Sequence, residues 1–364
     1  MDVICRIPGA HQMAGAMDVR GREYMVLVVR STLAFPDVPG GVARAAAEQT
    51  PLVYADTFTG APGFSATLWE TDFAFRKARC DVVVQGAAYA PGGRAAERVP
   101  VGLRVGGWSK GLNVVGYREW RVFGPSVAAT RPHPFTRAQF SYDTAFGGVD
   151  RLDPDDKTPP AYLPNPHGRG FASFRNQALL NGAPLPNTEE LGREVTSPYE
   201  EYRPMALGPV SRAAPQRLRF AGTYDENWEK NIFPFLPPDF DERYLQQVGE
   251  DQQIDPPAPG TEVVLRNLTP AGNEAFRLPN LDLPVVIFDA RGDTVLDRVM
   301  RPDTLLFDTE TRRVSAVWRA SAPVRRHLSE FRLAWVGHPS RAMTRAMASG
   351  RRYVPMRQLE RLDS

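Results

Sequence analysis

The hydrophobic and polar positions of this 364-residue chain follow the period of strands far more often than that of helices. Residues 22–35 are rich in β-branched and aromatic side chains, and Pro36 closes the segment. Residues 25–29 are apolar at every position, and such a run indicates a strand that is buried on both faces. We therefore predict an interior strand at the start of the chain.

The next hydrophobic segments are short and separated by turn residues. Residues 99–105 and 108–115 flank Gly106 and Gly107, which predicts a β-hairpin. Residues 64–75 and 80–89 are expected to form another strand pair, and 117–123 a further strand. Turn signals recur about every 8–12 residues, a spacing typical of a sandwich or barrel.

From about residue 125 the pattern is broken by prolines and glycines for more than a hundred residues. This segment is nevertheless rich in aromatic residues, in which disordered segments are poor. We therefore expect an ordered, loop-rich insertion wrapped over the β-core. Short helices are predicted at 215–220, 223–230, 239–247 and 340–348, with Thr223 or Asp225 as a helix cap.

Strand patterns resume after Gly260, at 261–268, 274–278, 284–289, 293–300, 304–308 and 313–320. The predicted fold is mainly β, a sandwich or barrel built from strands of both ends of the chain. The predicted divisions are an N-terminal β-rich half, a loop-rich insertion, a C-terminal β-rich half and a tail, at 1–124, 125–260, 261–322 and 323–364.

The stretch from Pro237 to Asp255 combines prolines, carboxylates, aromatics and amides without a regular period. We interpret four of its polar residues as structural groups that satisfy the backbone of an irregular segment, namely Asp239, Asp241, Asp251 and Gln252. Six aromatics occur in or just before it: Tyr224, Trp228, Phe233, Phe235, Phe240 and Tyr244. The favoured interpretation is that they fasten the loops to the β-core. The alternative is that some are exposed as anchors of a protein interface.

Composition excludes several classes of partner. The apolar fraction of 42% and charged fraction of 24% are those of a globular protein, and no apolar run approaches the ~20 residues of a membrane span. The net charge of +2 and the scattered basic residues disfavour nucleic acid. The first residues lack the pattern of a signal peptide, so we expect a cytoplasmic protein. Cys5 and Cys80 could pair, but nothing around them demands it.

The candidate catalytic motifs are weak, and we expect no cofactor or bound metal. The five histidines show none of the usual zinc-ligand spacings. Ser109 lies in a Gly-x-Ser-x-Gly sequence, but a strand-like run follows where a hydrolase nucleophile needs a helix. Asp239 and Asp241, with Asp251 and Asp255 nearby, could form an acid–base pair or a metal site. Caps and turns explain these carboxylates equally well.

Six short motifs occur in a fixed order along the chain: Tyr89-Ala-Pro-Gly-Gly93, Pro134-Phe-Thr-Arg137, Ala145-Phe-Gly-Gly148, Gly222-Thr-Tyr-Asp-Glu-Asn-Trp228, Pro238-Asp-Phe-Asp-Glu-Arg-Tyr244 and Asp251-Gln-Gln253. Together they resemble the bacterial domain-of-unknown-function family 2169 (DUF2169). The resemblance runs from near Arg22 to about Ala320. The opening residues and the tail are less family-like.

The resemblance implies a function. Members of the family are typically encoded beside type VI secretion genes and are regarded as adaptors or chaperones. They help to load an effector, often one with a PAAR tip, onto the VgrG spike. The implied protein is a non-enzymatic, cytoplasmic loading factor, with no established catalytic residues to carry over. The alternatives are a hydrolase that uses Asp239 and Asp241, and a carbohydrate-binding β module that uses exposed aromatics.

Overall fold

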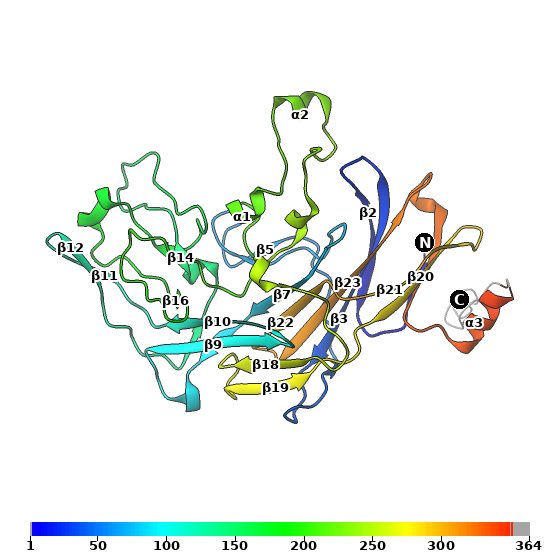
Figure 1. The fold of residues 1–364 in the computed structure, drawn as a ribbon, viewed down its shortest axis with the longest axis horizontal. Helices are drawn as coiled ribbons and strands as arrows, with labels where there is room; N and C mark the ends of the chain where they lie inside the picture. Colours follow the sequence, from blue (N-terminus) through cyan, green and yellow to red (C-terminus); the bar gives the residue numbers. More distant parts are fainter. Residues whose placement is uncertain (1, 350, 352–364) are drawn as a thin grey trace.

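The protein is described here by a computed structural model that covers residues 2–349 and 351. The fold is mainly β, as predicted, and strands from both ends of the chain meet in the same sheets (Figure 1). Among the described residues no sheet closes into a barrel, so the barrel alternative of the prediction is set aside. One large buried cluster draws residues from all three main sheets.

The largest sheet joins the two ends of the chain. Its strand order is β17 (Gln253–Ile254), β7 (Cys80–Gln85), β22 (Thr304–Asp308), β23 (Arg313–Pro323), β3 (Glu23–Ala34) and β2 (Ala10–Met17), with β4 (Arg44–Ala45) on the far end of β3. β3 is the predicted interior strand, and Leu27, Val28 and Val29 are fully buried. β23 pairs with β3 from Arg313 opposite Ala34 to Pro323 opposite Tyr24.

The second sheet contains the predicted hairpin. Its order is β16 (Thr188–Glu189), β10 (Trp108–Val115), β9 (Arg98–Val105), β18 (Glu262–Arg266) and β19 (Asn273–Arg277). Trp108 lies opposite Val105, as Gly106 and Gly107 predict. Ser109 is an exposed residue within β10, opposite Arg104, so its motif belongs to a hairpin and not to a nucleophile elbow.

The third sheet has the order β1 (Asp2–Cys5), β24 (Phe331–Val336), β20 (Leu283–Asp289) and β21 (Thr294–Met300). β24 comes from the segment that the sequence assigned to a tail, and its Trp335 is buried. α3 (Arg341–Ala348) follows, close to the predicted helix at 340–348. Residues 350 and 352–364 of the predicted tail lie outside the described residues. Cys5 and Cys80 are both free thiols.

Residues 64–75 and 80–89 do not form the predicted pair. Only β6 (Thr67–Trp69) is a strand in the first segment, and it pairs with β5 (Thr57–Phe58). β7 instead lies between β17 and β22, two strands that are far from it in the sequence, and is buried in the middle of the largest sheet. The other short pairs are β8 (Ala87–Tyr89) with β13 (Arg137–Gln139), β11 (Trp120–Phe123) with β12 (Ser126–Ala129), and β14 (Phe146–Gly147) with β15 (Arg169–Gly170).

The insertion is built from loops and short helices. Its first part packs with Trp120 of β11 in a small separate buried cluster that includes Phe146 and Tyr202. Its second part lies on the main core, to which Met205, Leu207 and Ile254 contribute. The short helices of the insertion are η2 (Tyr142–Thr144), η3 (Phe174–Leu179), α1 (Pro215–Leu218), α2 (Glu226–Asn231), η4 (Glu242–Leu245) and η5 (Glu250–Gln252). Outside the insertion, η1 (Pro91–Gly93) follows β8 and η6 (Leu328–Glu330) precedes β24. None of the described helices is long and apolar enough to cross a bilayer.

Candidate protein-interaction site

Residues 222–240 form a projection that rises from the insertion and carries α2 at its far end (Figure 1). The Asp225 side chain caps α2 by accepting a hydrogen bond of 2.8 Å from the Trp228 amide, as the sequence predicts. The projection narrows at its base, where the Asp239 carboxylate accepts from the Thr223 amide at 3.0 Å and from its hydroxyl at 2.7 Å. These two hydrogen bonds between Thr223 and Asp239, which we call the clasp, hold the two ends of the projection together.

Gly222 makes this clasp possible. Its φ of +84° lies in the left-handed region, and a Cβ there would approach the Asp239 carboxylate to 3.0 Å and the Phe240 amide to 3.1 Å. The Asp241 amide then donates to the Phe220 carbonyl at 3.0 Å, just below the clasp. The Gly222-Thr223 and Asp239-Phe240-Asp241 segments, which are parts of two of the six family-like motifs, therefore meet at the base of the projection.

Four of the predicted site aromatics lie on the projection and pack on one another. The Trp228 ring contacts Tyr224 edge to face at a centroid distance of 4.7 Å and Phe233 at 5.6 Å. The Trp228 indole nitrogen donates to the Phe235 carbonyl at 2.9 Å. Tyr224, Phe233 and Phe235 remain 53%, 67% and 43% exposed. We call Tyr224, Trp228, Phe233 and Phe235 the aromatic tip.

The aromatic tip is not fastened to the β-core, which is the interpretation that the sequence favoured. None of its four rings belongs to a buried cluster of the described residues. The Phe235 ring lies beside Gly21, in the turn between β2 and β3. The edge-to-face angles of 70° and 86° also differ from the flat platform that a sugar ring needs.

Of the other two predicted aromatics, Phe240 is the last residue of the projection, at its base, and Tyr244 follows in η4; both are half-buried. Their rings contact each other at 5.9 Å, and the Arg217 guanidinium lies 5.4 Å from the Tyr244 ring centre. Neither ring belongs to a buried cluster of the described residues, and Tyr244 is linked to the N-terminal half through Arg217, which pairs with Glu70. The six candidate aromatics therefore comprise three exposed rings, Tyr224, Phe233 and Phe235, and three half-buried ones, Trp228, Phe240 and Tyr244.

Arg217 of α1 is the central cation beneath the projection. It is buried and pairs with the buried Glu70 carboxylate. Its guanidinium also donates to the Val210 carbonyl at 2.7 Å and to the Tyr244 carbonyl at 2.9 Å. This ion pair joins α1, η4 and residue 70 of the N-terminal half in one contact, because a buried charge must be paired and hydrogen-bonded.

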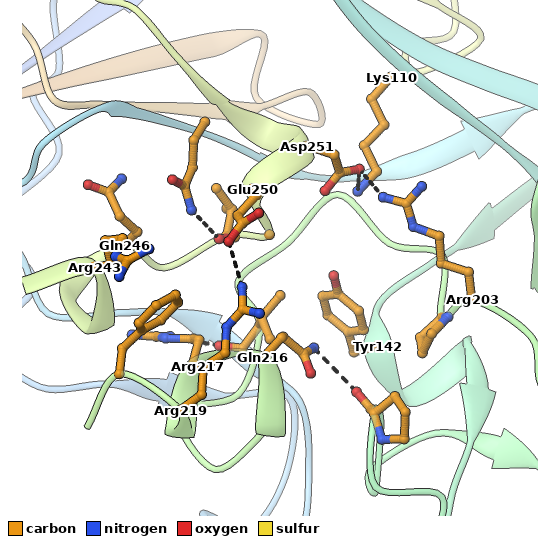
Figure 2. A pocket seen from close by; sticks show the side chains of 17 residues that line it. Lys110, Tyr142, Arg203, Gln216, Arg217, Arg219, Arg243, Gln246, Glu250 and Asp251 are labelled. Carbon is orange, nitrogen blue, oxygen red and sulfur yellow. Dashed lines mark hydrogen bonds and ion pairs between the residues drawn. The ribbon is translucent and has the colours of Figure 1, made fainter. Parts of the chain in front are cut away.

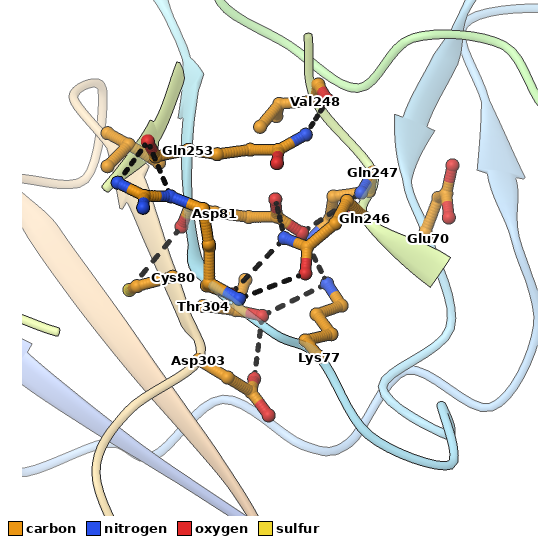
Figure 3. Close-up of polar contacts among 12 residues, drawn as sticks. Glu70, Lys77, Cys80, Asp81, Gln246, Gln247, Val248, Gln253, Asp303 and Thr304 are labelled. Carbon is orange, nitrogen blue, oxygen red and sulfur yellow. Dashed lines mark hydrogen bonds and ion pairs between the residues drawn. The ribbon is translucent and has the colours of Figure 1, made fainter. Parts of the chain in front are cut away.

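A second buried network ties the insertion to β7 (Figure 3). The Asp81 carboxylate accepts from the Gln246 side chain at 2.7 Å and from the Gln247 amide at 2.9 Å. Lys77 pairs with the same carboxylate at 2.6 Å and is itself almost fully buried. Thr304 of β22 accepts a further hydrogen bond from Lys77 at 3.1 Å. The network holds residues 246–247 against strands from both halves of the chain.

Asp251 and Gln252 form a third attachment. The fully buried Gln252 amide donates to the carbonyls of Val82 and Leu207 at 2.9 and 3.0 Å. Its oxygen accepts from Lys110, which also pairs with Asp251 at 2.8 Å. Burial lowers the pKa of the Lys110 ammonium. The structural role that the sequence predicts for Asp251 and Gln252 agrees with these contacts. Lys110, Arg217, Gln246 and Gln247 were missed, because their partners are distant in the sequence.

A cavity of about 470 Å³ opens beneath the projection (Figure 2). The charged residues that line it are paired: Arg203 and Lys110 with Asp251, Arg219 with Glu250, Arg243 with Asp241, and Arg217 with Glu70. Burial raises the pKa of the Tyr142 phenol, so this group stays protonated. Both lining carboxylates, Glu250 and Asp251, are thus paired with basic side chains.

The carboxylates of the hydrolase alternative are engaged in local structure. Hydrogen bonds from the Thr223 amide and hydroxyl lower the pKa of Asp239, and those from the Arg243 side chain and amide lower the pKa of Asp241. A general acid or base at neutral pH needs the opposite shift. Neither residue lines the cavity beneath the projection. Across the described residues, no group of three or more His, Cys, Asp or Glu side chains could hold a metal ion.

Comparison with known proteins agrees with the resemblance noted from the sequence. The model of a family described as an uncharacterized protein conserved in bacteria, DUF2169, matches residues 20–319. The chain therefore belongs to the DUF2169 family. The match includes strands of all three main sheets and the whole insertion with its projection, while β1, β2 and β24 lie outside it. No curated protein and no solved structure matches the chain.

Proposed function

We propose that this protein is a non-enzymatic adaptor or chaperone that binds a type VI secretion effector and helps to load it onto the VgrG spike. The proposal extends what the family resemblance implies, including an effector that carries a PAAR tip. The single observation that supports it best is the aromatic tip, an exposed cluster of large rings on a projection with a rigidly anchored base.

The physical properties of the tip suit protein recognition. Tyrosine, tryptophan and phenylalanine provide large contact area with few rotatable bonds, and they are enriched at the energetic centres of protein interfaces. Trp228 is already fixed by its hydrogen bond to Phe235, and Asp225 fixes the helix that carries it. Little conformational freedom is then left to lose on binding, which favours affinity.

The local charge pattern is also consistent with an interface. Polar residues surround the tip, including Glu226, Glu229 and Lys230 of α2. An apolar centre with a polar rim is the usual anatomy of a protein–protein contact. In the proposed mechanism the tip covers an apolar surface of the effector, while the sheets serve as a rigid support. Loading onto the spike would then release this contact.

The test is a tagged pull-down from the native bacterium under conditions in which secretion is active. The wild-type protein is expected to recover a VgrG or PAAR-type protein. A Tyr224→Ala/Trp228→Ala/Phe233→Ala variant is expected to recover at least tenfold less, after its folding is verified by circular dichroism.

The matched control is Tyr54→Ala/Phe64→Ala, which removes two exposed rings that lie outside the projection. It is expected to recover as much partner as the wild type. Equal recovery by the tip variant would place the interface elsewhere. Recovery of no spike or effector protein by the wild type would contradict the adaptor function.

A further inference from the structure

The free edges of the three main sheets differ in how well they are protected. β2 forms one edge of the largest sheet and pairs only with β3. Its eight residues contain no charged side chain and no proline. Edge strands of natural proteins are usually short, charged, bulged or covered, because their unpaired backbone groups invite another strand.

The other edges show such protection. β16 and β17 are two residues long, and β1 is four. β19 is covered by the loop at residues 40–41, since the Gly40 amide donates to the Ala275 carbonyl and the Arg277 amide to the Gly41 carbonyl. β21 carries Asp297 and Arg298 and has an irregular register with β20. Among the described sheets, β2 is the long edge without these features.

The direction of the free backbone groups follows from the hairpin. Asp18 and Arg22 are opposite each other at the end of the β2–β3 ladder. The Asp18 amide donates to the Arg22 carbonyl, so they form a hydrogen-bonded pair. Because such pairs alternate in an antiparallel ladder, the even-numbered residues of β2 bond to β3 and the odd-numbered ones point outward. The exposed Gln12 side chain accordingly reaches the Met13 carbonyl at 3.3 Å. The residues whose backbone groups point away from β3 are His11, Met13, Gly15 and Met17; we call them the outward residues.

The sequence of β2 is complementary to itself. An antiparallel pair related by a two-fold axis at Ala14 places Met13 opposite Gly15, Gln12 opposite Ala16 and His11 opposite Met17 of the other copy. Residues opposite each other share one face of the sheet, so in two of these pairs a large side chain meets a small one. The outward residues become the hydrogen-bonded pairs, and no like charges meet.

We propose that β2 pairs with β2 of a second copy of this chain, so that two large sheets join into one continuous sheet in a symmetric dimer. Such an interface is isologous, with the same surface on both subunits. It uses every outward backbone group of β2. This inference goes beyond the proposed adaptor function and does not depend on it.

The test is the mass of the purified full chain in solution, measured by light scattering or sedimentation equilibrium. The wild type is expected at twice the mass of one chain. Ala14→Glu and Ala14→Lys each place like charges opposite each other at the two-fold axis, so each variant alone is expected to be monomeric. An equimolar mixture of the two is expected to regain the dimer mass, because opposite charges then meet.

The matched control is Val299→Glu, which adds a charge to the exposed face of another edge strand and is expected to remain dimeric. Ala14→Cys in a Cys5→Ser background gives a second measurement, since residues opposite each other without hydrogen bonds are close enough for a disulfide. Mild oxidation is expected to link two chains. A monomeric wild type at micromolar concentration, or single charged variants that stay dimeric, would overturn the proposal.

Discussion

The two halves of the stretch between residues 222 and 255 have similar compositions but opposite roles. The projection at 222–240 is largely exposed, and its rings contact one another. The anchor that follows, residues 241–255, is joined to the sheets through Asp81, Lys110 and Arg217. Both halves contain aromatics, carboxylates and amides, so composition alone does not distinguish them.

The difference lies in the partners of the polar groups. In the projection, hydrogen bonds are local, as between Thr223 and Asp239. In the anchor, several join residues more than a hundred positions apart in the sequence, as between Gln246 and Asp81 or Gln252 and Val82. Side chains that contribute little to the core can change without loss of stability, so their identity can serve binding. Changes in the two halves should therefore separate stability from function.

The largest expected loss of stability comes from the anchor variant Asp81→Ala. It leaves the Lys77 ammonium buried without its carboxylate and removes the acceptor of Gln246 and Gln247. The free energy of unfolding, measured by urea denaturation, is expected to fall by about 3–5 kcal/mol. A loss below about 1 kcal/mol would show that this network does not hold the anchor.

A smaller loss is expected for Gln252→Ala. This change removes the amide that donates to the buried carbonyls of Val82 and Leu207, of which the Leu207 carbonyl keeps a hydrogen bond from the Val84 amide. Loss of these hydrogen bonds and of the acceptor of Lys110 is expected to cost about 1–3 kcal/mol, so the midpoint of urea unfolding should shift clearly. Gln216→Ala is the control, because its amide makes a single long hydrogen bond near the surface and its loss should change little.

The tip variant Tyr224→Ala/Trp228→Ala/Phe233→Ala should hardly change global stability. Its rings lie outside the buried clusters, and surface positions usually contribute within about 0.5 kcal/mol each. The measurement is the same urea titration. A loss as large as that of Asp81→Ala would mean that the tip supports the fold, which would remove the distinction between projection and anchor.

The smallest effect concerns the pH dependence of the clasp. The pKa of Asp239 is lowered by Thr223, so the clasp favours the ionised carboxylate. Its contribution is complete above the pKa of an unfolded Asp, about 3.9, and is lost as the pH falls through the lower folded value. The Thr223 amide resonance should therefore stay constant from neutral pH to about pH 4 and move below it. Asp239→Asn should abolish that titration.

The sequence predicted the elements better than their partners. The interior strand at residues 23–34, the hairpin at Gly106-Gly107 and the cap at Asp225 follow from local patterns, and all three are present. The pairing of β7 with β22 was missed, because neighbouring strands in a sheet can be distant in the sequence.

The candidate site was predicted in the same uneven way. The six aromatics were identified as a group, but their spacing does not tell exposed rings from buried ones. Exposure depends on whether the chain leaves the surface at Gly222, and this requires the Asp239 clasp from residues farther along the chain. The family, in contrast, could be predicted from the sequence, because the six motifs and their order are read directly from the residues.

Hydrogen–deuterium exchange of the protein with and without the effector recovered in the pull-down tests the central claim most directly. The amides of residues 222–240 are expected to exchange readily in the free protein and to become protected when the effector binds. The anchor at 241–255 is expected to be protected in both states. Protection that appears elsewhere on the chain, with no change across 222–240, would contradict the account.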